Sequence, residues 1–188
     1  MKDYPRLTTR RLLLRGFDPS DAARVERLAG DFAVADTTLE IPHPYLPGMA
    51  IEWFATHQPK FEAGEMIALA ITGRESGELI GAVGLSIRQR FDRAELGYWI
   101  GKPYWGRGYC TEAAQAVVAY GFTQLGLNRI FAVHFRRNPA SGRVMQKLGM
   151  KQEGLFRQHI KKWDRYEDEV IYGILKSEWE ALAPDNRS

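Results

Sequence analysis

Short stretches rich in apolar residues, separated by polar and glycine-containing links, recur in the first half of the chain. Short apolar runs bounded in this way are typical of strands. The links RESG and RFD between the last three stretches are short enough for hairpins, so these strands are expected to form an antiparallel meander. The strands predicted here are Arg11–Phe17, Met66–Thr72, Glu78–Arg88 and Arg93–Ile100.

Other stretches have apolar residues at intervals of three and four, which is the spacing of an amphipathic helix. Two of these helices begin with Asp-Pro or Asn-Pro, where a capping side chain precedes a proline in the first turn. Glycines mark the ends of three. The predicted helices run from Asp18 to Gly30, from Met49 to Ala63 with a kink or break at Pro59, from Cys110 to Gly126 and from Asn138 to Gly149.

The second half of the chain adds strands at residues 129–135, 152–162 and 169–175, while residues 31–47 read as a loop. Together these elements predict an α/β fold with a mixed, mostly antiparallel central sheet and helices on both faces. No linker, internal repeat or change of composition divides the chain, so residues 1–188 are expected to form a single domain.

Composition and charge limit the possible functions. The chain has 188 residues, 45% of them hydrophobic, and its net charge of +3 fits a partner with a few phosphates better than a polyanion. The single cysteine excludes an internal disulfide and a cysteine-based zinc site, and the histidines lack metal-ligand spacing, so no metal is expected. Neither a leader nor a run of about eighteen apolar residues is apparent, which predicts a cytoplasmic protein without membrane contact.

The segment GKPYWGRGYCTEA joins the strand that ends at Ile100 to the helix that begins at Cys110. The first N–H groups of a helix lack internal partners and carry partial positive charge, which makes this junction an anion site. Gly106 and Gly108 let the backbone approach phosphate oxygens closely, and Arg107 adds a positive charge. The alternative is a tight glycine turn without a ligand.

Two common phosphate loops are excluded by particular residues. In a P-loop, lysine and serine or threonine would stand in place of Arg107 and Gly108, so a Mg²⁺-nucleotide is not expected. In a dinucleotide fingerprint, glycine would replace Thr111 and an acidic residue would follow about twenty positions later, where the sequence has none. The phosphate ligand is therefore expected to belong to another class.

The segment AELGYWIGKPYWGRGYCTEA, followed by NPASGRVMQKLGM from Asn138, resembles the GNAT superfamily of acetyl-CoA-dependent N-acetyltransferases. Within it, the chain is similar to the branch that contains ribosomal-protein N-terminal acetyltransferases. The resemblance extends from the TRRLLLR opening through the PHPY segment to the final strand. It implies the GNAT fold, in which two neighbouring strands of the central sheet splay apart.

The resemblance implies a coenzyme A site around the glycine loop. Backbone amides of residues 107–111 would hold the pyrophosphate, while the strand at residues 98–100 and the Asn138 side chain would contact pantetheine. Arg143 and Lys147 are candidates for phosphate contacts, although a solvated helix face explains them too, and a helix cap explains Asn138. The coenzyme-binding residues implied are Tyr98, Trp99, Ile100, Gly106, Arg107, Gly108, Tyr109, Cys110, Thr111, Asn138 and Arg143.

The same resemblance assigns catalytic roles. Glu95 stands where histone-acetylating members carry a general base, and its alternative role is that of a structural carboxylate. Many members have a tyrosine as the thiolate acid where this chain has Met145, and the ribosomal branch points to Ser141 instead. A hydrogen bond within the first helical turn is the alternative role of Ser141. A main-chain N–H near Ile100 would polarise the thioester carbonyl.

Cys110 stands where the family usually has glycine or alanine. Its small side chain keeps the approach to phosphate open. A helix N-terminus favours the thiolate, so iodoacetamide is expected to inactivate the enzyme and acetyl-CoA to protect it. The alternative is an inert buried residue.

Three aromatic residues are candidates for acceptor contacts. In this family the segment between the first two helices and a loop near the last strands border the acceptor cleft. Here that loop is KKWDRYEDE, residues 161–169, which otherwise reads as a solvated hairpin turn. The candidates are Tyr45, Trp53 and Trp163.

These features predict an N-acetyltransferase that moves the acetyl group of acetyl-CoA to a primary amine by direct attack in a ternary complex. The preferred acceptor is a protein N-terminal α-amine of the kind that ribosomal proteins offer. Small amines such as polyamines or aminoglycosides are an alternative acceptor class. A non-catalytic coenzyme A sensor and an RNA-associated module are alternatives to an enzyme, although direct nucleic-acid contact is not expected. Monomer and homodimer are both compatible with the sequence.

Overall fold

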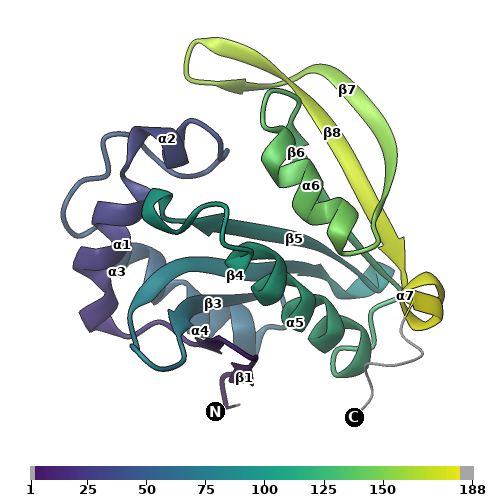
Figure 1. The fold of residues 1–188 in the computed structure, drawn as a ribbon, viewed down its shortest axis with the longest axis horizontal. Helices are drawn as coiled ribbons and strands as arrows, with labels where there is room; N and C mark the ends of the chain where they lie inside the picture. The colour runs from purple at the N-terminus through teal and green to yellow at the C-terminus, as the bar shows by residue number, and fades with distance from the viewer. Residues whose placement is uncertain (1–2, 183–188) are drawn as a thin grey trace.

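The computed structural model describes residues 3–182 of the chain. Within this part the strands form one sheet in the order β1-β2-β3-β4-β5-β6-β8-β7 (Figure 1). Of the neighbouring pairs in these residues, β5 with β6 is parallel and the others are antiparallel, which confirms the mixed sheet predicted from the sequence. The strands are β1 (Leu7–Thr8), β2 (Leu12–Arg15), β3 (Met66–Gly73), β4 (Leu79–Arg88), β5 (Arg93–Ile100), β6 (Arg129–Phe135), β7 (Lys151–Lys162) and β8 (Arg165–Leu175).

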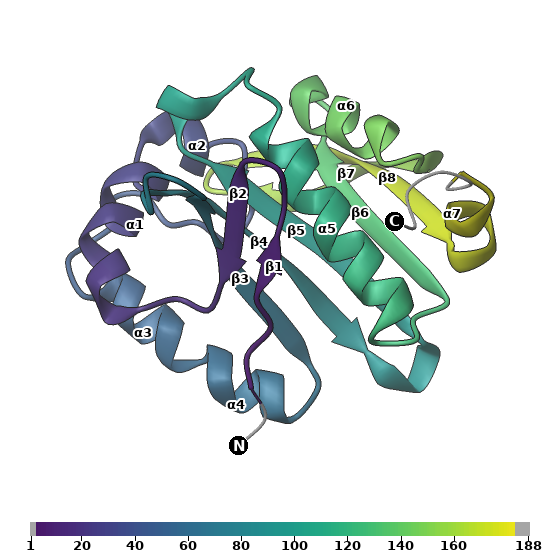
Figure 2. The same ribbon diagram turned by 60° about the horizontal axis from the view of Figure 1, so that its bottom comes forward.

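Helices cover both faces of the sheet, as predicted. Two helices, α5 (Tyr109–Thr123) and α6 (Pro139–Lys147), contribute to the larger core on one face (Figure 1). On the other face α1 (Ala22–Ala29) and α3 (Met49–Ala55) build a second apolar cluster with Trp99 (Figure 2). In residues 3–182 no helix is both long and apolar enough to cross a membrane.

Helix α5 lies close to the sheet because its buried stripe consists of small residues. Ala113 and Ala114 are fully buried, and a Cβ on Gly121 would come within 2.8 Å of the Ile130 side chain. Such close packing leaves little room for the helix to shift. It therefore fixes the glycine loop at the N-terminus of α5 relative to the central strands.

The helix predicted over residues 49–63 is divided in two. The chain bends at Thr56, and α4 (His57–Glu62) follows α3. Pro59 lies in the first turn of α4, where a missing N–H costs no hydrogen bond within the helix. The break expected from Pro59 is confirmed, but it falls before the proline.

Two short helices were absent from the sequence prediction. In the stretch expected to be loop, α2 (Phe32–Ala35) is capped by Asp31, which accepts a hydrogen bond from the Ala33 N–H at 2.8 Å. The helix α7 (Lys176–Leu182) follows β8 directly. Neither is long enough to show a clear period.

The hairpin turn expected over residues 161–169 is present, but only part of this segment is solvated. Strands β7 and β8 continue to a tight turn at Trp163 and Asp164, and residues 163–166 are exposed. Lys162, Glu167 and Glu169 are buried instead, because one side of the hairpin end packs against neighbouring segments.

Strands β5 and β6 diverge soon after they meet. Their parallel pairing extends over three residue pairs and ends where Glu95 lies opposite Phe131. Beyond this point β6 follows β8 while β5 stays with β4, which leaves a wedge between the two strands (Figure 1). The splayed strand pair of the predicted fold is thereby confirmed.

The tip of the β7–β8 hairpin is fastened to the segment that follows α2. The Lys162 Nζ donates hydrogen bonds to the carbonyls of Leu39 and Ile41, both at 2.8 Å. The Trp163 ring stacks on Phe32 with ring centroids 5.5 Å apart. Asp36 adds ion pairs to nearby arginines, Arg137 at 2.6 Å among them. We call this contact between residues 32–41 and the hairpin tip the strap.

Strand β7 forms one edge of the sheet and is irregular. Its pairing with β8 shifts register twice, and Gln158 has a left-handed φ of 48°. Its exposed positions include the basic residues Lys151, Arg157 and Lys161.

His57 of α4 is buried among aromatic rings, and its Nε2 has no hydrogen-bond partner within residues 3–182. Burial lowers its pKa from 6.5 to about 4, with a smaller contribution from Lys60. The unfolded chain therefore binds a proton before the native state does, and the free energy of unfolding falls as pH drops from 6.5 to about 4.

Replacing His57 with leucine is expected to remove this dependence. Denaturant unfolding at a series of pH values should show a slope about 1.4 kcal/mol per pH unit smaller for the variant across this window. Parallel curves for the two proteins would contradict the buried neutral histidine.

Candidate active site

The loop before α5 contains two glycines with left-handed backbone. Gly106 has a φ of 74°, and Gly108, the N-cap of α5, has a φ of 78°. Side chains disfavour this conformation, so the turn itself requires glycine at both positions. Both residues are exposed, and the first turn of α5 offers backbone N–H groups that have no partner within the helix.

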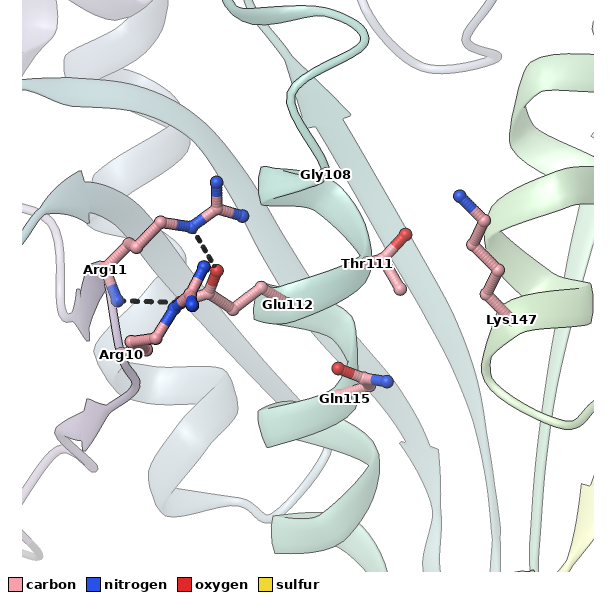
Figure 3. A pocket seen from close by; sticks show the side chains of 7 residues that line it. All are labelled: Arg10, Arg11, Gly108, Thr111, Glu112, Gln115 and Lys147. Carbon is pink, nitrogen blue, oxygen red and sulfur yellow. Dashed lines mark hydrogen bonds and ion pairs between the residues drawn. The ribbon is translucent and has the colours of Figure 1, made fainter.

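An open pocket of about 420 Å³ lies beside the first turns of α5 (Figure 3). Lys147 of α6 reaches toward Thr111 from one side, and Arg10 and Arg11 approach from the other (Figure 3). Free backbone N–H groups, the helix dipole and basic side chains together make such a pocket attractive to phosphate. The lining residues are Arg10, Arg11, Gly108, Thr111, Glu112, Gln115 and Lys147.

Glu112 ties the N-terminal strands to α5. Its carboxylate accepts hydrogen bonds from the Thr9 hydroxyl at 2.7 Å and from the Arg11 backbone N–H at 2.8 Å and Nε at 2.7 Å. Burial opposes ionisation, but these hydrogen bonds outweigh it and hold the pKa of Glu112 below its usual value. Arg11 in turn donates to the Arg107 carbonyl at 3.0 Å. The glycine loop is therefore held from outside its own helix.

Tyr98 of β5 contacts Ser141 of α6. The two hydroxyl oxygens lie 2.9 Å apart, and the Tyr98 hydroxyl also donates to the Ser141 carbonyl at 3.1 Å. Burial, and then the neighbouring Cys110, raise the pKa of Tyr98, so the phenol keeps its proton. This pair forms a neutral proton-donating group on the face of the sheet that α5 and α6 cover.

Glu95 lies at the apex of the wedge and faces the opposite side of the sheet. Its neighbours Ala94 and Leu96 are buried in the core beneath α5, so the Glu95 side chain projects away from that helix. On its own face a Cβ at Gly97 would meet no atom within 4 Å. The carboxylate therefore borders open space.

Burial raises the pKa of Glu95, and the negative charges of Glu169 and, more weakly, Glu40 add to this effect. Arg88 opposes it. A raised pKa makes a carboxylate a better proton acceptor, because the ideal base has a pKa near the working pH.

Comparison with known proteins identifies the family. Residues 11–151 match the family described as an acetyltransferase (GNAT) domain. This chain belongs to the GNAT family. The uncharacterized N-acetyltransferase YoaA of Bacillus subtilis (strain 168) is 34% identical to it over 176 residues, which are 92% of this chain and 98% of YoaA. This GNAT protein is therefore an N-acetyltransferase that uses acetyl-CoA, as predicted.

Two further GNAT relatives are informative. The putative ribosomal N-acetyltransferase YdaF of Bacillus subtilis (strain 168) is 35% identical over 105 residues, which cover 55% of this chain and 57% of YdaF. The crystal structure of a GNAT acetyltransferase from Bacillus anthracis has a TM-score of 0.82 and 26% identity, and the match covers 92% of this chain and 99% of that one.

The residues of this GNAT protein that were predicted to contact coenzyme A from α6 and β5 have different surroundings. Asn138 caps the helix, and its Oδ1 accepts a hydrogen bond from the Ser141 N–H at 3.4 Å. Lys147 lines the pocket beside α5, whereas Arg143 is exposed and does not line it. On β5, the Ile100 carbonyl accepts a hydrogen bond from the Trp105 indole at 2.6 Å. Coenzyme contacts of these residues stay predictions.

The expected thiolate character of Cys110 was wrong. The thiol packs at the edge of the main core, and burial raises its pKa to about 12. Desolvation outweighs the attraction of the helix N-terminus, because a charge in an apolar setting loses its hydration. Cys110 thus matches the alternative of an inert, small buried residue.

Iodoacetamide is now expected to modify Cys110 only slowly at pH 8, since the thiolate is the reactive form. The measurement is the rate of carbamidomethylation by mass spectrometry, with a small-molecule thiol as the reference. Modification as fast as that of the reference would contradict the buried thiol.

The three predicted acceptor residues do not gather at one place. Trp163 lies in the strap, where its ring forms a cluster with Phe32 and His43. Tyr45 and Trp53 pack against the second core beneath α1 and α3. Their contacts with an acceptor stay predictions.

Sequence reasoning missed several groups around this site. Arg10 and Gln115 line the pocket, and Glu169 and Glu40 act on Glu95. The positive charge of Arg10 in the TRRLLLR opening was the available signal, but the residues that lie near Arg10 in space come from distant segments. No group of three or more histidine, cysteine or acidic side chains within residues 3–182 is arranged to hold a metal ion.

Proposed function

We propose that this N-acetyltransferase acetylates protein N-terminal α-amines, with Glu95 as the general base. The observation that carries the proposal is the half-buried Glu95 carboxylate at the apex of the wedge, with open space beside it at Gly97. An amine that enters from this side of the sheet meets the base before it reaches the wedge. The coenzyme-facing groups lie on the other side.

The glycine loop and the pocket beside α5 fit the donor. Two left-handed glycines leave the first N–H groups of α5 accessible, and Arg10, Arg107 and Lys147 surround them with positive charge. These groups hold the phosphates of coenzyme A, and the wedge between β5 and β6 receives pantetheine. When bound, acetyl-CoA supplies an electrophilic thioester carbonyl, which a main-chain N–H near Ile100 polarises.

Glu95 accepts the proton that the attacking amine loses as its nitrogen bonds to the carbonyl carbon. An α-amine has a pKa of about 8, against about 10.4 for a lysine side chain, so it needs less help to become neutral. A carboxylate with a moderately raised pKa suits this task. The similarity to YdaF, named a putative ribosomal N-acetyltransferase, supports the same acceptor class.

Ser141 donates its hydroxyl proton to the thiolate that leaves when the carbon–sulfur bond breaks, and it regains a proton from solvent water after the product departs. Tyr98 orients the Ser141 hydroxyl through their 2.9 Å contact, and its raised pKa keeps the phenol protonated throughout. Met145, which stands at the family's tyrosine position, is buried in the core.

Ser141→Ala and Tyr98→Phe are each expected to lower kcat by about 10-fold or more, with little change in acetyl-CoA affinity. The double variant should be no worse than the more damaged single variant, because the two hydroxyls act as one unit. Steady-state kinetics and acetyl-CoA titration provide the measurements. Unchanged turnover in both single variants would remove the pair from the mechanism.

The first test of the proposed function is a thermal shift of the purified protein with acetyl-CoA, with ATP and NAD as controls. A ligand at a concentration of about a hundred times its Kd raises the free energy of unfolding by about 2.7 kcal/mol. Peptides with free and with blocked N-termini are then assayed for acetylation. An equal shift with ATP, or acetylation of blocked peptides at a lysine only, would contradict the proposal.

A further inference from the structure

Glu169 is a buried carboxylate to which the mechanism above gives no role. On strand β8, Glu169 pairs with Phe135 of β6. On the other side of β6, Glu95 of β5 pairs with Phe131, which is four residues before Phe135. Side chains at even separations along a strand share a face, so Glu169 and Glu95 project from the same side of the sheet. Only 5% of Glu169 is exposed.

No hydrogen bond from residues 3–182 reaches the Glu169 carboxylate. Its one ion contact there is with the His159 Nε2 at 3.9 Å, which is too long for a hydrogen bond. Other buried acids of the chain are paired: Asp21 with Arg15 at 2.7 Å, and Glu167 with Arg137 at 2.8 Å.

A buried carboxylate without a partner is costly, because it loses its hydration and gains nothing in return. Burial accordingly raises the pKa of Glu169. Proteins pair most such groups with protein atoms or ordered water, and unpaired ones are common at functional sites. The missing partner of Glu169 therefore points to a group that comes from outside the chain.

The space that Glu169 faces is the acceptor side of the wedge. Its negative charge is the largest charge effect on Glu95, and Glu40 of the strap segment adds a smaller one in the same sense. Gly97 leaves that side open. Two carboxylates on one face of the sheet, one of them beside the open position at Gly97, attract an acceptor with two positive charges better than an acceptor with one.

We propose that Glu169 is a specificity-determining residue that binds a second positive group of the acceptor while Glu95 faces the attacking amine. This inference rests on the proposed acetyl transfer to an amine and narrows the acceptor to amines that carry a second cation. Two sources offer that chemistry: a peptide whose residue after the N-terminus is lysine or arginine, and a small diamine.

The experiment compares matched acceptors that differ in one charge. One pair is a peptide beginning Ala-Lys and the same peptide beginning Ala-norleucine; the other is 1,4-diaminobutane and 1-aminobutane. Calorimetry in the presence of CoA gives affinities without turnover, and initial rates with acetyl-CoA give kcat/KM. The wild-type protein is expected to favour the dication of at least one pair by about 10-fold or more.

Variants then assign the preference to one side chain. Glu169→Gln is expected to reduce the preference for the dication to within about 3-fold, because dications lose much more affinity than monocations, and Glu169→Asp should restore part of the preference. Glu75→Gln, in the exposed β3–β4 turn, removes one negative charge elsewhere and should change nothing.

The proposal is supported if the wild-type protein prefers the dication in the peptide pair, in the amine pair or in both. The pair that shows the preference identifies whether the acceptor is a peptide or a small diamine. No wild-type preference in either pair, or an equal loss for dication and monocation in Glu169→Gln, would overturn it. The wild-type comparison needs no variant, so misfolding of Glu169→Gln cannot hide the answer. Absence of turnover with every amine would count against the proposed function, and the affinities would still decide the role of Glu169.

Discussion

Glu95→Gln is expected to lower kcat by about 100-fold or more, because the amide cannot take the proton from the attacking amine. The wild-type rate should rise with pH through a midpoint above the ordinary glutamate pKa of 4.5, since burial and Glu169 both raise the pKa of Glu95. The measurement is kcat against pH for both proteins, with acetyl-CoA saturating.

Two controls separate catalysis from a structural role. The thermal shift caused by acetyl-CoA should survive in Glu95→Gln, because the carboxylate faces away from the coenzyme side. A raised native pKa means that the folded state binds its proton first, so this contribution to stability is lost as pH rises through the native pKa. At pH 7 the variant should therefore be at least as stable as wild type, whereas a carboxylate that holds the fold would lose stability when replaced.

Gly108→Ala is expected to weaken acetyl-CoA binding by about 10-fold or more, and to cost about 1–2 kcal/mol of folding stability. A Cβ disfavours the φ of 78°, so the loop relaxes and its N–H groups no longer converge on the phosphates. Fluorescence or calorimetric titration with acetyl-CoA measures the loss.

Gly126→Ala is the matched control for that experiment. Gly126 has a φ of 66°, and a Cβ there would meet nothing within 4 Å, so the strain is similar while the site lies beyond the other end of α5. It should lose stability and keep its affinity for acetyl-CoA. Equal affinities in the two variants would mean that the glycine loop does not bind the phosphates.

The sequence predicted those parts of the structure that depend on residues close to one another in the chain. The short apolar runs of β3, β4 and β5 lie between clear polar links, so the bounds of these strands were predicted to within one residue. The small apolar stripe of α5 predicted that helix, although it ends at Thr123 and not near Gly126. The glycine loop was found for the same reason, since Gly106, Gly108 and the helix start lie within a few residues of one another.

The contacts that complete the site were hidden because they join distant parts of the chain. Arg11 and Glu112 are separated by 101 positions in the sequence, and Lys162 is hydrogen-bonded to Leu39, which lies 123 positions earlier. The local hydrophobic period of a sequence does not indicate such a pairing. The Cys110 error has a similar origin, because the sequence reveals the helix start but not the depth to which neighbouring elements bury the thiol.

The irregular edge strand has a consequence for assembly. An open sheet invites a neighbouring chain to add a strand at its border, which is a route to aggregation. Here one border is β1, which is two residues long, and the other is β7, with two register shifts, a left-handed residue and exposed basic side chains. Both borders are poor templates for backbone pairing. Any homodimer of this enzyme is therefore expected to form through helix or sheet faces, not by continuing the sheet from one copy into the next.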